Sequence, residues 1–247
     1  GAIERPLVFA DNDRPGIMLA GAVRTYINRY GVLPGKEILV FTNNDSAYAT
    51  AIDAHKAGAR VYVADVRQSP GGALVAEAKA LGIQVYPNTA ITSVNGKKTV
   101  RAVEVMELTE DGTGLTGAHF GINCDIVAMS GGWNPTVHLY SQSRGKLTWD
   151  DARVMFVPNP ETMSPINPSR SAGACRGSLD LPDCLAEGCA AGALAAKDAG
   201  FGDGAAPAAP SATSVTEEPV RAMWDVPCHG HKKKFHEFQN DSTSADL

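Results

Sequence analysis

Residues 36–67 read KEILVFTNNDSAYATAIDAHKAGARVYVADVR, and this stretch decides the fold. A branched apolar run that ends at Phe41 predicts a buried strand, and a second run, Arg60 to Ala64, predicts another. The residues between them predict a polar turn and an Ala-rich helix. A strand, a turn, a helix and a parallel strand within about 30 residues are typical of a βαβ nucleotide-binding unit.

The turn of this unit, Thr42 to Ser46, departs from the usual dinucleotide fingerprint. A G-x-G-x-x-G/A pattern would place glycines at Thr42 and Asn44 and a small residue at Ala47, and only the last is present. Those glycines make the tight turn and let the backbone approach a pyrophosphate. Asn tolerates left-handed backbone angles, so the turn itself can still form. Two interpretations stay open: a turn that grips a cofactor, and a Rossmann half that is retained for packing.

Asp65 ends the second strand, about 20 residues beyond the turn. An acidic residue at this place binds the ribose hydroxyls of a dinucleotide and repels a 2'-phosphate, which favours NAD over NADP. Arg67 weakens that preference, because an arginine here accommodates the phosphate. The alternative is that Asp65 is a solvated strand end.

The flanking sequence continues a doubly wound order. We expect helices at residues 17–30 and 73–81, and a third parallel strand at residues 83–86. Three further runs alternate around Asn-Gly and Asp-Gly turns and predict an antiparallel meander within residues 90–124. The predicted fold class is α/β, a Rossmann-like FAD/NAD(P)-binding fold that has a parallel sheet with helices on both faces plus a small antiparallel meander.

Two glycine-rich turns lie outside the central unit. The apolar run that follows Cys124 ends in Gly131-Gly132, at the carboxyl edge of a sheet, where open α/β folds bind ligands. Close contact with a nucleotide or flavin is one interpretation, and a tight strand exit is the other.

The second glycine-rich turn contains Gly173, Gly177 and Asp180 and precedes a helix predicted at residues 182–198. The unpaired N–H groups and the dipole of a helix N-terminus attract anions. We therefore expect a cofactor diphosphate or a ribityl chain at this turn.

The composition and charge of the chain argue against several functional classes. The chain has 247 residues with a formal net charge of −5, so no general attraction to nucleic acid or to an anionic membrane is expected. The five cysteines include no C-x-x-C pair, which is typical of reduced cytoplasmic thiols. Cys228-His229-Gly230-His231 makes at best an incomplete zinc site, and no metal is expected. No apolar run of about 18 residues and no signal peptide are present, so a soluble, cytoplasmic protein is predicted.

Three stretches together carry a family resemblance: residues 1–19, GAIERPLVFADNDRPGIML; residues 41–67, FTNNDSAYATAIDAHKAGARVYVADVR; and residues 171–192, SAGACRGSLDLPDCLAEGCAAG. They resemble the alpha subunit of heterotetrameric sarcosine oxidase and, more broadly, the pyridine nucleotide-disulfide oxidoreductase superfamily. The resemblance implies a flavoenzyme complex that oxidises sarcosine with oxygen to glycine, hydrogen peroxide and a one-carbon unit taken up by tetrahydrofolate.

The same resemblance implies cofactors and partners. NAD is bound by the alpha subunit, FMN lies at a subunit interface, FAD lies on a partner subunit, and tetrahydrofolate belongs to a domain outside this chain. The partners are the other subunits of a hetero-oligomeric oxidase. An alpha subunit of a related amine, opine or proline dehydrogenase is one alternative, and a vestigial Rossmann module that serves subunit assembly is another.

By this resemblance the chain is expected to be an internal segment with five parts. Residues 1–35 belong to a first dinucleotide-binding domain, residues 36–135 form a second Rossmann-like nucleotide domain, and residues 136–201 return to complete the first. Residues 202–219 are a linker by composition. Residues 220–247 begin a further domain.

The chain also departs from the family pattern. Gly173-Ala174-Cys175 replaces the Gly-Asp ending of reductase flavin motifs, and the lack of a redox-active C-x-x-C counts against a dithiol enzyme similar to thioredoxin reductase. No His, Glu or Lys is placed by motif as a general base, so no catalytic residue is expected in this chain. The candidate cofactor-binding residues lie in the turns and at the strand ends: Asn43, Asn44, Asp45, Ser46, Asp65, Arg67, Gly131, Gly132, Gly173, Gly177 and Asp180.

Overall fold

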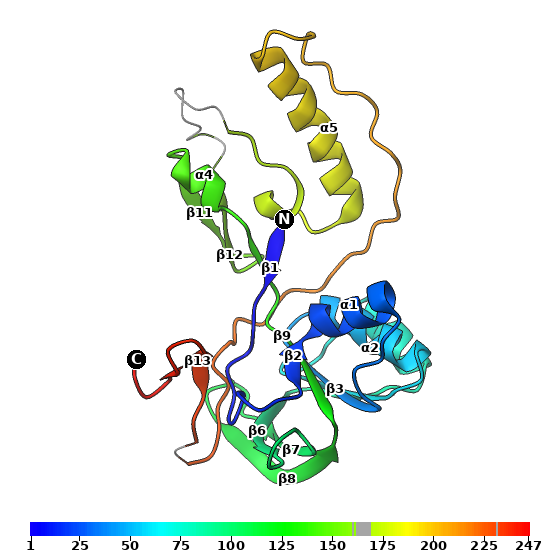
Figure 1. Ribbon diagram of the computed structural model, residues 1–247, viewed down its shortest axis with the longest axis vertical. Coiled ribbons are helices and arrows are strands. Elements are labelled where there is room, and N and C mark those ends of the chain that lie inside the picture. The colour runs from blue at the N-terminus through cyan, green and yellow to red at the C-terminus, as the bar shows by residue number, and fades with distance from the viewer. Residues whose placement is uncertain (160, 162–168, 231) are drawn as a thin grey trace. The chain divides into compact units, whose positions relative to one another are not determined.

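The computed structural model describes residues 1–159, 161, 169–230 and 232–247, and it divides the chain into two compact units. Unit 1 comprises Gly1–Ile3 and Trp133–Thr216, and unit 2 comprises Glu4–Gly132 and Glu217–Leu247. Figure 1 shows the elements of both units.

Unit 2 is built on a five-stranded parallel sheet. The strand order is β2 (Ile17–Leu19), β9 (Ile126–Ser130), β3 (Glu37–Thr42), β4 (Arg60–Asp65) and β5 (Gln84–Tyr86). Thr42 at the carboxyl end of β3 pairs with Asp65 on one side and with Ser130 on the other. The carboxyl ends of the three central strands therefore meet at one edge, which is where open α/β sheets bind ligands.

Helices cover one face of this sheet. They are α1 (Ala20–Tyr30), α2 (Ser46–Lys56) and α3 (Ala73–Ala80), and Figure 1 shows α1 and α2 on the same side. Their apolar residues pack with Ile38 and Val40 of β3 in one buried cluster. Gly31 ends α1 in the left-handed conformation, as the sequence predicts for a helix stop.

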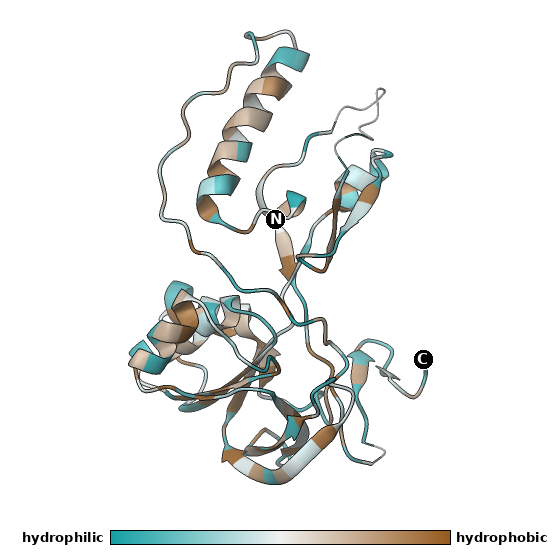
Figure 2. Cartoon of the chain, turned by 180° about the vertical axis from the view of Figure 1, so that it is seen from behind, coloured by the Kyte–Doolittle hydropathy of each residue, from teal (hydrophilic) through white to brown (hydrophobic). Residues whose placement is uncertain are grey.

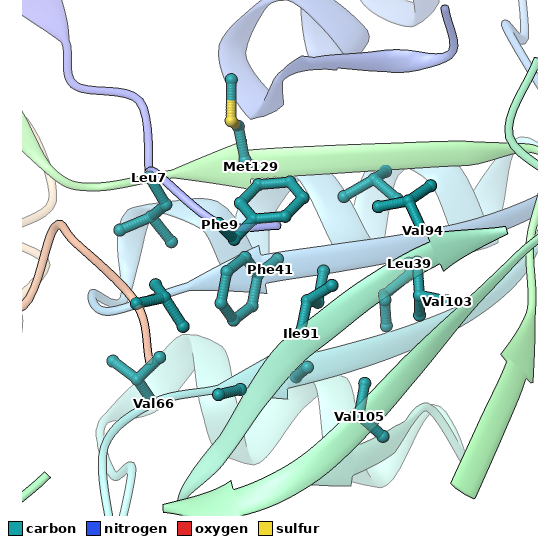
Figure 3. Close-up of a cluster of buried hydrophobic side chains, with 14 of the residues drawn as sticks. Leu7, Phe9, Leu39, Phe41, Val66, Ile91, Val94, Val103, Val105 and Met129 are labelled. Carbon is teal, nitrogen blue, oxygen red and sulfur yellow. The ribbon is translucent and has the colours of Figure 1, made fainter. Parts of the chain in front are cut away.

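The antiparallel meander covers the opposite face of the sheet. Its strands are β6 (Thr89–Asn95), β7 (Ala102–Leu108) and β8 (Leu115–Asn123). Alternate residues of β3, Leu39 and Phe41, point into a second buried cluster with Ile91 and Val103 of the meander (Figure 3). The α/β class and the Rossmann-like order are confirmed, whereas the prediction of helices on both faces is wrong for the described part of unit 2. The apolar side chains of the meander bury this face instead, and an apolar strand such as β3 does not reveal which kind of layer covers it.

Unit 2 also contains chain segments that the sequence assigned elsewhere. Strand β2 and helix α1 belong to its sheet and its helical layer, although residues 1–35 were expected in a first dinucleotide domain. The boundaries of the two units thus differ from those of the predicted segments. The reason is that apolar residues of these flanking segments complete the core of the central βαβ unit. The return of residues 136–201 to a first dinucleotide domain stays a prediction.

The C-terminal part of the chain, Glu217–Leu247, belongs to unit 2, and the beginning of a further domain at residues 220–247 stays a prediction. Met223, Val226 and Phe235 are buried, and the short hairpin β13 (Phe235–Glu237) and β14 (Ser242–Thr243) follows. The buried Asn12 side chain donates to the Phe235 carbonyl at 2.8 Å and accepts from the Phe235 N–H at 2.8 Å. This amide pairs with the backbone as a neighbouring strand would.

Unit 1 contains short elements and one long helix. Strand β1 (Ala2–Glu4) pairs with β10 (Trp133–Pro135), and β11 (Leu147–Asp150) forms a hairpin with β12 (Met155–Pro158). Two short helical segments and one long helix complete it: α4 (His138–Gln142), η2 (Gly173–Arg176) and α5 (Leu181–Asp198). Helix α5 has no buried residue, and hydrophobic and hydrophilic residues are interspersed along it (Figure 2). In the described residues of either unit, no helix is both long enough and apolar enough to span a bilayer.

We predict that Phe41→Ala destabilises unit 2 by about 3–5 kcal/mol, the usual cost of removing a buried Phe side chain. Phe41 has no exposed surface, and its ring meets Phe9 edge-on with 5.3 Å between centroids. Urea unfolding followed by circular dichroism measures the change. The matched control is Val32→Ala on the surface, where Val32 is 49% exposed; equal effects of both substitutions would contradict the assigned core.

Candidate functional site

The turn between β3 and α2 is buried and hydrogen-bonded within itself. Thr42, Asn43, Asn44 and Asp45 are each at most 2% exposed. The N–H of Asn44 donates to Thr42 Oγ1 at 3.1 Å, and the N–H of Asn43 donates to the Ser130 carbonyl at 3.4 Å. Neither asparagine adopts a positive φ. The turn therefore forms without the left-handed residues that a glycine fingerprint supplies.

Side-chain amides extend this network across the strand ends. Asn44 Nδ2 donates to Asn43 Oδ1 at 3.0 Å and to Ser130 Oγ at 3.2 Å, and the Ser46 hydroxyl donates to Asn44 Oδ1 at 2.6 Å. The four consecutive predicted site residues Asn43, Asn44, Asp45 and Ser46 thus belong to one hydrogen-bond network, and their role in cofactor binding stays a prediction. Their polar atoms contact one another and neighbouring backbone groups, so a phosphate would have to compete with these contacts.

Arg67 lies between two buried carboxylates. Its Nη1 is 2.7 Å from Asp45 Oδ1, its Nη2 is 2.8 Å from Asp65 Oδ2, and its N–H donates to Asp65 Oδ1 at 2.9 Å. The Tyr48 hydroxyl donates to Asp65 Oδ2 at 2.9 Å. Buried charges of this kind are stable only when they are paired and hydrogen-bonded.

The pKa values of the side chains in this network depend on their burial and on their charge pairing. Burial raises the pKa of the Asp65 carboxyl, while the hydrogen bonds and the charge of Arg67 act to lower it. Burial alone would lower the pKa of Arg67, but its contacts with Asp65 and then Asp45 raise it above its usual value. Burial, followed by the charge of Asp65, raises the pKa of the Tyr48 hydroxyl. Tyr48 therefore stays a hydrogen-bond donor to Asp65.

The geometry of Asp65 differs from that of an exposed strand-end carboxylate. Asp65 has no exposed surface, and both of its oxygens accept hydrogen bonds from Arg67 or Tyr48. A ribose would have to displace one of these two partners, so ribose binding by Asp65 stays a prediction. The sequence placed Arg67 near Asp65 but gave no sign that Tyr48, on the preceding helix α2, reaches the same carboxylate.

Residues Glu217–Val226, which we call the crevice segment, lie along the same edge of the sheet. Asn43 Nδ2 donates to the carbonyls of Arg221 and Met223 at 3.0 and 3.2 Å, and the Arg221 N–H donates to the Asn43 carbonyl at 3.1 Å. The N–H of Glu218 donates to Asp45 Oδ2 at 2.7 Å. The composition of residues 202–219 predicted a linker, and nothing in it marked residues 217–219 as partners of the turn.

Two further side chains of the crevice segment bind the strand ends. Arg221 Nη1 donates to the Val66 carbonyl and, at 3.3 Å, to Asn88 Oδ1. Trp224 Nε1 donates to the Gly131 carbonyl at 2.8 Å. The Arg5 guanidinium lies over the Trp224 ring, 4.5 Å from its centroid.

The Gly131-Gly132 pair is surrounded by the chain itself. A Cβ added at Gly131 would lie 2.7 Å from the Pro6 carbonyl oxygen and 2.9 Å from Trp224 Cδ1. Gly132 has a φ of +84°, and a Cβ there would lie 2.9 Å from Arg5 Nη2. These contacts favour the strand-exit interpretation, and cofactor contact at either glycine stays a prediction.

In unit 1 the turn before α5 is held by carboxylates. Glu187 accepts from the Gly173 N–H at 2.8 Å and from the Ser178 hydroxyl at 2.6 Å. Asp180 accepts from the Ser214 hydroxyl at 2.6 Å and from the Val215 N–H at 3.1 Å, and these hydrogen bonds lower its pKa. Gly177 has a φ of +96°, and a Cβ there would lie 2.7 Å from Val157 Cγ1. Local structure therefore explains the glycines of this turn, independently of any role in ligand binding.

A pocket of about 490 Å³ lies beside this turn and α5 within unit 1. Arg176 of η2 is exposed at its rim, and Arg170 pairs with Asp198 at 2.7 Å. Neither arginine was singled out by the sequence, because only the fold brings them to the same side of α5. The pocket is lined by Tyr140, Pro158, Ser169, Arg170, Ser171, Arg176, Ala186, Glu187, Ala190, Ala191 and Leu194.

The structure gathers no metal cluster from its described residues: no group of three or more His, Cys, Asp or Glu side chains could hold an ion there. His231, the last residue of the Cys-His-Gly-His stretch, lies outside the described residues. All five cysteines are free thiols, and burial raises the pKa of Cys124 to about 12.

Solved structures with a similar fold are dehydrogenases and reductases by name. L-proline dehydrogenase from P. horikoshii matches with a TM-score of 0.54 and 20% identity over 82% of this chain and 34% of that one. Thioredoxin reductase from Lactococcus lactis matches with a TM-score of 0.52 and 17% identity over 72% and 56%, respectively. At these identities the matches show the fold alone.

The relatives found by sequence have a higher identity to this chain than these solved structures have. The alpha subunit of sarcosine oxidase from Corynebacterium sp. (strain P-1) is 40% identical over 255 residues, and that from Rhizobium meliloti (strain 1021) is 35% identical over 253 residues. Each match covers 100% of this chain but only 25% and 23% of the relative, respectively. No protein-family model matches. The chain is thus similar, over its full length, to about a quarter of the length of the sarcosine oxidase alpha subunits that it matches.

Proposed function

We propose that the chain is the nucleotide-domain segment of the alpha subunit of a sarcosine oxidase-like flavoenzyme complex. The complex would oxidise sarcosine with oxygen to glycine, hydrogen peroxide and a one-carbon unit that passes to tetrahydrofolate. The observation that carries the proposal is the full-length match to sarcosine oxidase alpha subunits at 35–40% identity. The Rossmann-like architecture of unit 2 supports it independently of the sequence match.

The cofactors and partners of the proposed complex follow from the resemblance. The alpha subunit would bind NAD, FMN would lie at a subunit interface, FAD would lie on a partner subunit, and tetrahydrofolate would bind in a domain outside this chain. Other subunits of the oxidase are the partners, and neither nucleic acid nor a membrane is among them. In this scheme the chain is a non-catalytic or electron-relay scaffold. The bond-breaking step on the amine takes place on another subunit.

The pocket beside α5 is the better candidate for this chain's contact with a nucleotide. Its lining includes the apolar side chains of Ala186, Ala190 and Leu194, and Arg176 adds an exposed cation. An apolar lining with a few placed polar groups is the usual composition of a cofactor site. The turn between β3 and α2 is less suitable, because its polar groups already bind one another and the crevice segment.

A second candidate function is an assembly module that binds partner subunits and no longer binds a nucleotide in unit 2. The observation that favours it is the buried turn from Thr42 to Asp45, which retains the βαβ geometry without an open crevice. The two functions are compatible if the nucleotide binds beside α5.

We predict that the isolated chain forms no hydrogen peroxide from sarcosine, even with FAD and FMN added. The described part of the chain places no general base by motif, and its buried carboxylates at the sheet edge are engaged by Arg67 and Tyr48. A peroxidase-coupled assay checks this, with the complete oxidase complex as the positive control. Turnover by the isolated chain would disprove the assigned scaffold role.

We also predict that Arg176→Ala in the full-length subunit weakens NAD binding at least about tenfold, or about 1.4 kcal/mol. Loss of one charged contact to a phosphate typically costs this much or more. Isothermal titration calorimetry measures the affinity. Arg153→Ala is the matched control, since Arg153 lies in the same unit and pairs with Asp150 on the surface. Unchanged affinity in the Arg176 variant would exclude the pocket beside α5.

A further inference from the structure

We infer that the edge of the sheet in unit 2 is a peptide-binding site, that residues Glu217–Val226 of the same chain fill it, and that this occupancy closes it to a dinucleotide. The inference goes beyond the proposed function, because it rests only on contacts inside unit 2. It holds whether or not the subunit binds NAD beside α5.

The backbone of the crevice segment forms an isolated parallel bridge with Val8, which lies outside the strands of the sheet. The N–H of Val8 donates to the Trp224 carbonyl at 2.7 Å, and the N–H of Val226 donates to the Val8 carbonyl at 2.8 Å. Asn43 supplies the second row of contacts, with its own carbonyl and its side-chain amide. Main-chain hydrogen bonds on both sides are the hallmark of peptide recognition by strand addition.

Side chains of the crevice segment fix its register. Met223 and Val226 are buried in the core beneath the meander. Arg221 spans the ends of two elements, since its guanidinium binds the Val66 carbonyl and Asn88 Oδ1. Trp224 is held by the Gly131 carbonyl and by the cation of Arg5. Side-chain anchors of this kind give a bound peptide its specificity.

Glycines of unit 2 make room for these anchors. Gly112 has a φ of +74°, and a Cβ there would collide with the Arg221 guanidinium and lie 2.9 Å from Met223 Cε. A Cβ at Gly131 would lie 2.9 Å from Trp224 Cδ1. At both glycines the missing Cβ leaves space that side chains of the crevice segment occupy.

The electrostatics of the turn also oppose a pyrophosphate. A phosphate at a Rossmann turn needs the free N–H groups and the positive dipole of the helix N-terminus. Here Asp45 stands at the N-terminus of α2 and places its carboxylate there, paired with Arg67 and bound by the Glu218 N–H. A second negative group at this position would be repelled.

One residue that stands in place of a fingerprint glycine, Asn44, also supports the peptide site. A glycine there would leave the backbone open to a phosphate but would supply no amide. Asn44 uses its amide to fix Asn43 and Ser130, and Asn43 in turn holds two carbonyls of the crevice segment. The asparagine at position 44 thus favours the crevice segment over a phosphate.

Hydrogen–deuterium exchange of the full-length protein tests the inference, with and without NAD at millimolar concentration. In the wild-type protein, the amides of Glu218, Arg221 and Val226 should exchange at least about tenfold more slowly than those of residues 205–213. NAD should leave the exchange of residues 42–48 unchanged. Arg221→Ala should speed exchange across Glu217–Val226 about tenfold, which corresponds to about 1.4 kcal/mol, and Arg60→Ala on the surface of β4 should not.

The wild-type measurements alone can overturn the inference, so it does not depend on any variant folding. Exchange of the crevice segment as fast as that of residues 205–213 would show that the segment is not bound. Slower exchange of residues 42–48 in the presence of NAD would show that the crevice is open to a dinucleotide. Either result would leave the proposed function untouched, which is tested separately by Arg176→Ala.

Discussion

The pairing of Arg67 with Asp45 and Asp65 is the interaction on which the carboxyl edge of the sheet in unit 2 depends. The guanidinium joins the end of β4 to the N-terminus of α2, and all three groups are nearly or fully buried. Removing one partner of a buried ion pair typically costs about 3–5 kcal/mol, because the other charge is left without compensation. The network therefore fixes the turn, and the fixed turn presents Asn43 and Asp45 to the crevice segment.

Because this network fixes the turn, the fold of the chain does not by itself tell which ligand the edge of the sheet binds. The βαβ geometry, the parallel sheet and the meander form a fold that is shared with solved structures of L-proline dehydrogenase and thioredoxin reductase, and the sequence relatives are named sarcosine oxidase alpha subunits. The place where such folds bind a dinucleotide holds a paired carboxylate, two asparagines and a segment of the same chain. A fold can host many functions, so function has to be argued from the site. The pocket beside α5 and the homology to sarcosine oxidase alpha subunits carry the proposed function here.

The sequence predicted elements much better than it predicted contacts. The strands at β3, β4 and β5, the helices α2, α3 and α5 and the meander follow from apolar periodicity and from Gly or Asn-Gly signals, which act over a few residues. The covering of one sheet face by the meander was missed because the apolar residues of β3 on its two faces look alike. The contacts of Asp65 with Tyr48, and of Asn43 with Arg221, join residues that are close only after folding. Composition marked Glu217–Pro219 as linker, although the backbone of a polar segment can bind a polar turn well.

A crystal structure of the full-length protein soaked with NAD tests the closed crevice most directly. The account predicts that Glu217–Val226 stays in place, with Arg221 bound to the Val66 carbonyl and no nucleotide density at Asn43–Ala47. A pyrophosphate seated on the N-terminus of α2, with Glu217–Val226 displaced, would contradict it.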